Sequence, residues 1–157
     1  MPAARPIVVV LFGPVDSCLR VRSQRLVPGD ADRSAITAPA SATLQLRSAG
    51  NGSAGTQNVK LVASDSWTEG GISYSNRPAL GTSIGTLGPT TTNTSYSVPL
   101  TVSGLTGELG QHLSFGIASS SSDGLDLNSK EAGSTVARKL VVIFSGPGAL
   151  PRRGGRK

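Results

Sequence analysis

The sequence contains only one cysteine and one histidine, and this scarcity excludes several kinds of site. A single Cys cannot form an internal disulfide, and Cys18 with His112 does not supply the ligand set of a structural zinc site. The segment 81–85 matches the G-x-S-x-G pattern of serine hydrolases. That motif requires a following helix and a His base, whereas a Thr/Gly/Pro-rich segment follows here and the one His begins a strand-like run. The sequence therefore predicts no enzyme.

Carboxylates are also too few to form an obvious cation site. Asp123 and Asp126 are close together in a Ser/Gly-rich stretch, where a turn explains them adequately. Calcium takes about six to eight oxygen ligands, and two carboxylates do not fill these positions. We therefore expect no metal and no cofactor, and calcium binding has no support in the sequence.

Helical periodicity is absent as well, whereas short apolar runs separated by Gly, Pro, Asn and Ser recur. Five segments show apolar residues at every second position, as expected for antiparallel strands with one face in the core and one in water. These sets are Ala42, Leu44 and Leu46; Val59, Leu61 and Ala63; Tyr96, Val98 and Leu100; Leu113, Phe115 and Ile117; Leu125 and Leu127. The run 140–144 is apolar on both faces, which predicts a strand covered on both sides. The pattern is typical of an all-β sandwich or barrel.

The net charge of +6 is concentrated at the two ends of the chain. Between residues 41 and 146, acidic and basic residues balance: Asp65, Glu69, Glu108, Asp123, Asp126 and Glu131 against Arg47, Lys60, Arg77, Lys130, Arg138 and Lys139. Nucleic-acid binding requires Lys and Arg to cluster on a folded face. We therefore expect no nucleic-acid partner.

The two ends differ from the balanced body. Residues 1–40 lack sustained alternation and are predicted to be a poorly structured or aberrant segment. Within it, residues 5–18 contain an apolar run that is too short to span a membrane; a short signal-peptide core and a buried or unstructured segment both remain open interpretations. Residues 147–157 are predicted to be a disordered basic tail.

The most specific motif begins at Trp67, the only tryptophan of the chain. Trp67 is followed by Glu69, by Ile72 and Tyr74 at alternate positions, and by the Asn76-Arg77-Pro78 element. The segment resembles the W-x-E-x-x-I-x-[WY]-x-N-x-P signature of carbohydrate-binding module family 96, also called the DNRLRE or disaggregatase-related domain. Further elements resemble that family in the same order: Ser41–Leu46, Ser119–Gly124, Asn128–Ala132 and Leu140–Phe144.

The resemblance implies a jelly-roll-type antiparallel β-sandwich over residues 41–146. The Asp-x-Tyr element and the Arg-x-Tyr-Leu-x-Phe strand with which the family normally begins are absent here. We therefore predict a jelly roll that lacks its N-terminal strands, through divergence of this end or through a frameshift or truncation of the gene. Missing strands would leave unpaired sheet edges, at which the chain is predicted to self-associate.

The resemblance also implies a secreted, extracellular module that binds polysaccharide without catalysis, with acidic glycans favoured. The predicted ligand-binding residues are Lys60, Arg77 and Tyr74. The cationic side chains of Lys60 and Arg77 suit sugar carboxylates. Trp67, Glu69, Asn76, Pro78, Lys130 and Glu131 are predicted to be structural members of the family pattern. For Trp67 we favour packing over sugar stacking. The alternatives are a structural or adhesion module without a sugar site, and a fragment of a longer secreted protein.

Overall fold

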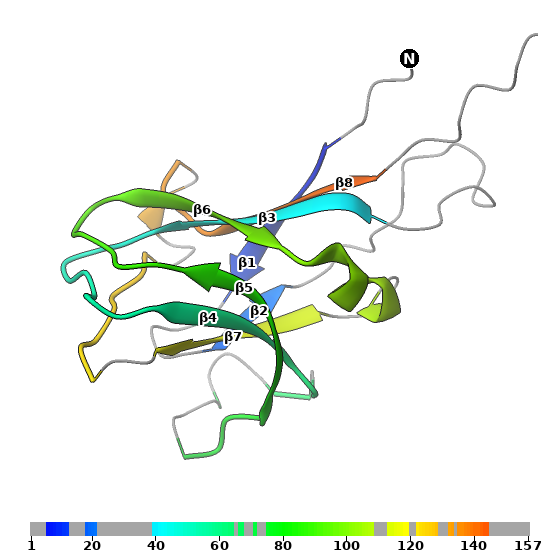
Figure 1. The fold of residues 1–157 in the computed structure, drawn as a ribbon, viewed down its shortest axis with the longest axis horizontal. Helices are drawn as coiled ribbons and strands as arrows, with labels where there is room; N and C mark the ends of the chain where they lie inside the picture. The colour runs from blue at the N-terminus through cyan, green and yellow to red at the C-terminus, as the bar shows by residue number, and fades with distance from the viewer. Residues whose placement is uncertain are drawn as a thin grey trace, which may run out of the picture.

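Eight β-strands in two layers make up most of the described chain (Figure 1). The computed structural model describes residues 6–12, 18–21, 39–64, 66–67, 71, 75–108, 113–119, 122–128, 132–133 and 135–144. The strands are β1 (Pro6–Phe12), β2 (Cys18–Val21), β3 (Pro39–Arg47), β4 (Gln57–Val62), β5 (Leu80–Leu87), β6 (Ser95–Leu100), β7 (Leu113–Ser119) and β8 (Lys139–Phe144). Two short 3-10 helices, η1 (Val102–Gly104) and η2 (Thr106–Glu108), follow β6. Within these ranges, no helix has the length and apolar character needed to cross a bilayer.

The strands pair antiparallel throughout and form a sandwich, which confirms the predicted all-β fold. Strands β3, β6 and β8 form one layer, with β3 in the middle, and strands β4, β5 and β7 form the other, with β4 in the middle. Strand β1 extends the first layer beside β8, and β2 extends the second beside β7. A short β1–β2 pairing then links the two layers in the order β5-β4-β7-β2-β1-β8-β3-β6. Eight strands in two sheets are typical of a jelly roll.

Two strands, β1 and β2, precede residue 39, in a part of the chain where the sequence pattern indicates no strands. Strand β1 pairs with β8 over Pro6–Val10, and β2 pairs with β7 over its whole length. The sequence signal failed because this apolar run lacks alternation, and a continuous apolar run does not distinguish a strand from other buried segments. Most of residues 1–40 and all of the tail at 147–157 lie outside the described residues. The domain boundaries given above therefore stay a prediction.

The core lies between the two layers and follows the alternation of the strands. In β3, Ala42, Leu44 and Leu46 are buried, as the sequence predicts, and they belong to one apolar cluster with Leu113 and Phe115 of the other layer. Because side chains of a strand point alternately to opposite faces, the residues between these positions lie on the outer surface. Outer-face residues of β3 are therefore available for contacts with a ligand.

Two strands depart from the predicted pattern. In β4 the register against β5 shifts on both sides of Lys60, and the buried residue after Val59 is Val62, not Leu61 or Ala63. A bulge changes which face the following residues occupy. In β8, Val141 and Ile143 are only half-buried, so the prediction that both faces of this strand are covered holds for one face alone.

Hydrogen bonds fasten three loops together at one end of the sandwich: residues 48–56 after β3, 88–94 after β5 and 122–128 after β7. The buried Ser48 accepts a hydrogen bond from the Thr94 backbone N–H at 2.9 Å and its hydroxyl contacts the Thr91 carbonyl. The Ala49 N–H donates to the Asp126 carbonyl, and the Asp123 carboxylate accepts from the Ala54 N–H at 2.9 Å. These bonds satisfy backbone groups of all three loops, so this end is structurally defined.

Candidate functional site

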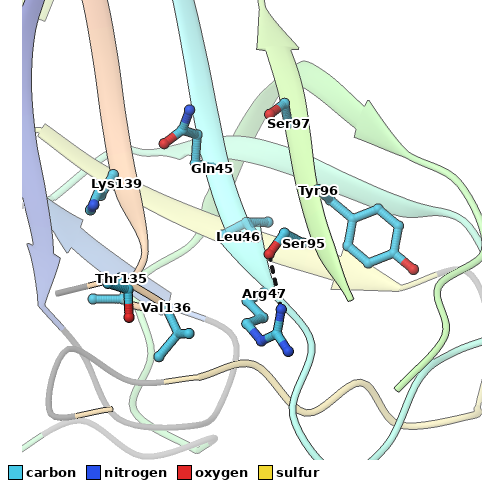
Figure 2. A pocket seen from close by; sticks show the side chains of 10 residues that line it. Gln45, Leu46, Arg47, Ser95, Tyr96, Ser97, Thr135, Val136 and Lys139 are labelled. Atoms are coloured by element: carbon cyan, nitrogen blue, oxygen red, sulfur yellow. Dashed lines mark hydrogen bonds between the residues drawn. The ribbon is translucent and has the colours of Figure 1, made fainter. Parts of the chain in front are cut away.

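A groove of about 200 Å³ crosses the outer face of β3 and β6 beside the start of β8 (Figure 2). Its lining residues are Gln45, Leu46, Arg47, Ser95, Tyr96, Ser97, Thr135, Val136, Ala137 and Lys139. Two of them, Arg47 and Lys139, are cationic, and none is acidic. We call this feature the cationic groove.

The strand register explains why these side chains meet. Gln45 of β3 lies opposite Ser97 on one side and opposite Lys139 on the other, while Arg47 lies opposite Ser95. Gln45 and Arg47 are two residues apart, so they share the outer face. Diagonal neighbours on adjacent antiparallel strands are about 7–8 Å apart, which places Lys139 and Arg47 within reach of one ligand. The groove thus combines two cations, an amide and hydroxyl groups.

Arg47 is held in place from two sides. Its guanidinium Nη1 donates to the Ser95 hydroxyl at 3.2 Å, a contact visible in Figure 2. Its backbone carbonyl accepts from the Asn128 N–H at 2.9 Å, and the next residue is the buried Ser48 of the fastened loops. A positioned, half-buried guanidinium loses little conformational freedom when it binds, so this side chain is suited to recognise a planar anion.

A second hollow, of about 580 Å³, lies at the connection between β4 and β5 in the other layer. Its lining residues are Ala63, Ser64, Ser66, Trp67, Gly71, Asn76, Pro78 and Ala79. The Asn76 side-chain amide donates to the Gly71 carbonyl at 2.7 Å, and the hydroxyls of Ser64 and Ser66 are hydrogen-bonded at 2.7 Å. Trp67 is 8% exposed, so most of its ring packs against protein. We call this feature the loop hollow.

The residues predicted from the sequence to bind ligand do not meet in either hollow. Lys60 is half-buried on β4, between Ser83 of β5 and Gly116 of β7. Arg77 is half-buried in the β4–β5 connection, and neither cation is among the residues that line the two hollows. Tyr74 lies outside the described residues, as do Glu69, Lys130 and Glu131 of the predicted structural set. Their roles stay a prediction.

The sequence interpretation overlooked the cationic groove. Its one signal was the alternation in β3, which assigns Gln45 and Arg47 to an exposed face. The partners Ser95 and Lys139 become neighbours only through pairing of strands that are distant in sequence. In the part of the chain that the structure describes, no cluster of three His, Cys, Asp or Glu side chains could hold a metal ion.

Comparison with known proteins assigns the chain to a family. None of the curated proteins matches it significantly. The model of carbohydrate-binding module family 96 matches residues 31–144, well over half of the chain, and spans both the cationic groove and the loop hollow. The β-sandwich described above and this match agree with the resemblance found in the sequence, and the chain belongs to carbohydrate-binding module family 96.

Proposed function

We propose that the chain binds polysaccharide without catalysis, that it prefers acidic glycans, and that the cationic groove is the binding site. The observation that carries this proposal is the pairing of Arg47 and Lys139 with amide and hydroxyl groups on one exposed sheet face. A guanidinium can bind a sugar carboxylate through two parallel hydrogen bonds, while Gln and Ser side chains suit sugar hydroxyls. Membership of a family of binding modules supports a role in binding alone.

The electrostatics of the groove lead to a second expectation. The body of the chain carries no net charge, so attraction to a polyanion has to come from a few local cations. Exposed charges are screened over about 8 Å at physiological ionic strength. Binding is therefore salt-sensitive and of modest affinity. Polysaccharides that carry carboxylates occur outside cells, and we accordingly propose that the chain acts as a secreted protein.

The test is affinity electrophoresis of the full chain in gels that contain alginate, pectin or a neutral glucan. Arg47→Ala and Lys139→Ala are each expected to weaken retardation by alginate or pectin roughly ten-fold, because each removes a charge-assisted contact. Lys60→Ala and Arg77→Ala test the binding residues predicted from the sequence, and they locate the site elsewhere if they alone weaken retardation.

Charge at the C-terminal end requires its own control. Arg152, Arg153, Arg156 and Lys157 attract any polyanion without specificity. A variant with Ser at these four positions is expected to keep most of its retardation by acidic gels. If retardation is lost in this variant and is unaffected by the groove substitutions, the chain is a structural or adhesion module without a sugar site.

A further inference from the structure

We propose that Asn51 is a site of spontaneous covalent modification, at which its side-chain amide is converted to a carboxylate whenever the fastened loops open. Asn51 is the only asparagine of the chain that is followed by glycine. It lies exposed to solvent in the loop 48–56, between β3 and β4. This inference does not rest on the proposed function, and each can fail without the other.

The modification follows from the chemistry of an asparagine that precedes a glycine. The backbone nitrogen of Gly52 attacks the side-chain Cγ of Asn51 and forms a bond to it. The Cγ–Nδ2 bond of Asn51 breaks, and the amide takes up the proton of the Gly52 nitrogen and leaves as ammonia. Water then opens the succinimide ring at either of its carbonyls, which gives aspartate or isoaspartate. Glycine favours the attack, because no Cβ shields its nitrogen and its backbone is conformationally free.

In the closed loops, both residues of this dipeptide are held in place. The Asn51 Nδ2, which is the leaving group, donates to the Gly124 carbonyl at 2.9 Å. The Asn51 backbone carbonyl accepts from the Asp126 N–H at 3.2 Å. Gly52 packs so closely against the Thr90 carbonyl that a Cβ would collide with it. Ring closure requires rotation of the Asn51 side chain and backbone, which these contacts restrict, so the reaction proceeds from an open form of the loops.

A small number of polar contacts keeps the fastened loops closed. The buried Ser48 hydroxyl contacts the Thr91 carbonyl and accepts from the Thr94 N–H at 2.9 Å. The Asp123 carboxylate accepts from the Ala54 N–H at 2.9 Å, a contact that is exposed to solvent. Loops that are held by such contacts open locally more often than the whole domain unfolds. The frequency of this local opening therefore sets the rate of the reaction.

The modified loop cannot close again in the same way. An aspartate has no N–H to donate, so the Gly124 carbonyl loses its bond to residue 51. An isoaspartate also lengthens the main chain by one carbon atom directly before Gly52, where the Thr90 and Thr91 carbonyl groups leave no space. Both products therefore favour the open form. Asn51 acts as an irreversible record of how long the loops have been open.

The site is tested by incubating the full chain in warm, mildly alkaline buffer, with and without a denaturing concentration of guanidinium chloride. Trypsin releases residues 48–60 as one peptide, which contains Asn51 and also Asn58, an internal control that precedes Val59. Mass spectrometry with fragmentation follows each amide, and a protein isoaspartate methyltransferase detects isoaspartate. In denaturant, Asn51 is expected to convert at least roughly ten-fold faster than Asn58 and at least roughly ten-fold faster than Asn51 of the native chain. Asn51→Gln is expected to abolish the isoaspartate signal of this peptide.

Substitution of Ser48 tests the control by loop opening. Ser48→Ala removes the hydroxyl that fastens two of the loops, and it is expected to raise the native rate at Asn51 about ten-fold. Ser41→Ala, which changes an exposed serine of β3, is the matched control and is expected to leave the rate unchanged. Denaturation curves show whether both variants are folded. If Ser48→Ala is not, guanidinium chloride below the unfolding transition is expected to accelerate Asn51 in the unsubstituted chain.

The modified chain itself provides the last comparison. After conversion in denaturant and removal of the denaturant, it is expected to melt roughly 4 °C or more below the unmodified chain treated in the same way but only briefly. The proposal is overturned if Asn51 converts no faster than Asn58 in denaturant, or if Asn51 converts equally fast in native and denatured chains. It is also overturned if neither Ser48→Ala nor mild denaturant accelerates the reaction, or if the modified chain melts like the unmodified one.

Discussion

Gly52 lies where two loops approach so closely that no side chain fits between them. A Cβ atom at this position would meet the Thr90 carbonyl oxygen and lie 2.9 Å from the carbonyl carbons of Thr90 and Thr91. Backbone cannot yield as a flexible side chain can, so Gly52→Ala is expected to lower the free energy of unfolding by about 1–3 kcal/mol. Gly50→Ala is the control, since a Cβ there meets nothing within 4 Å. Urea denaturation of both variants measures the difference, and equal midpoints would contradict the described packing.

Tyr96 links one of the fastened loops to β6 through its hydroxyl. Hydrogen bonds from the Thr91 hydroxyl and the Thr91 backbone N–H, at 3.3 and 2.8 Å, lower the pKa of Tyr96 below its usual value of 10.0. The native state then loses this proton at a lower pH than the unfolded chain does. Its stabilising contribution is fully present above the unfolded pKa and is lost as the pH falls through the folded pKa.

The expected result is a pH-dependent difference between two proteins. The urea midpoint of the unsubstituted chain should rise relative to that of Tyr96→Phe as the pH is raised toward 10.0. Phenolate absorbance identifies the group, because Tyr74 is the only other tyrosine. Parallel curves for the two proteins over this range would show that the hydroxyl is not engaged as described.

At the scale of single residues, the sequence predicts which face of a strand a side chain occupies better than it predicts its hydrogen-bond partner. Alternation in β3 correctly assigns Leu44 to the core and Arg47 to the surface. It contains no information about Ser95, which becomes the hydrogen-bond partner of Arg47 only after β3 pairs with β6. For this reason the cationic groove could not be predicted from the sequence, although the alternation assigns Arg47 to the outer face of β3.

At the scale of elements, the two faces of β8 differ in burial, and substitutions on each face can measure this difference. Leu140 is 1% exposed, and its replacement by Ala is expected to cost about 2–5 kcal/mol, because it leaves a cavity in the core. Val141 is half-buried on the opposite face. Val141→Ala is therefore expected to cost only about 1 kcal/mol, a typical value for a point substitution. Thermal unfolding compares the two variants, and a similar loss in both would mean that the outer face is covered after all.

Strand β4 shows why element boundaries and faces are not fixed by periodicity alone. Its apolar residues suggest that Val59, Leu61 and Ala63 share one face, yet Val62 is buried and Ala63 is exposed. The register shifts against β5 produce this change, and they arise from pairing with a neighbour rather than from the residues of β4 alone. A period-two pattern does not reveal a bulge until the partner strand is known.

At the scale of the whole molecule, β1 and β2 cover the sides of β8 and β7 that face away from β3 and β4. Removal of residues 1–21 would expose both strands as open edges, which are templates for pairing with another chain. The shortened chain is expected to self-associate and to unfold at a lower temperature than the full chain. Analytical ultracentrifugation of both proteins checks this outcome. A shortened chain that stays monomeric at high concentration with an unchanged melting temperature would refute the pairing of β1 with β8.

The global arrangement was partly accessible from the sequence. The all-β class follows from alternation and turn residues, and the motif around Trp67 led to the correct family. The completion of both layers by β1 and β2 was missed, because the apolar run at 7–12 resembles several other kinds of segment and its partner β8 is remote in the chain.

The pairing of β1 with β8 also determines when a newly made chain can fold. Pro6 is paired with Ile143, so β1 has no neighbour in its own layer until β8 has left the ribosome. The pairs β3–β6 and β4–β5 can form earlier, since their strands emerge sooner. Closure of such distant contacts costs loop entropy before it gains stability, and it is slow in β-sandwiches. The native core is therefore completed only once β8 has emerged, and the nascent chain passes through a period in which its apolar strands are accessible to chaperones.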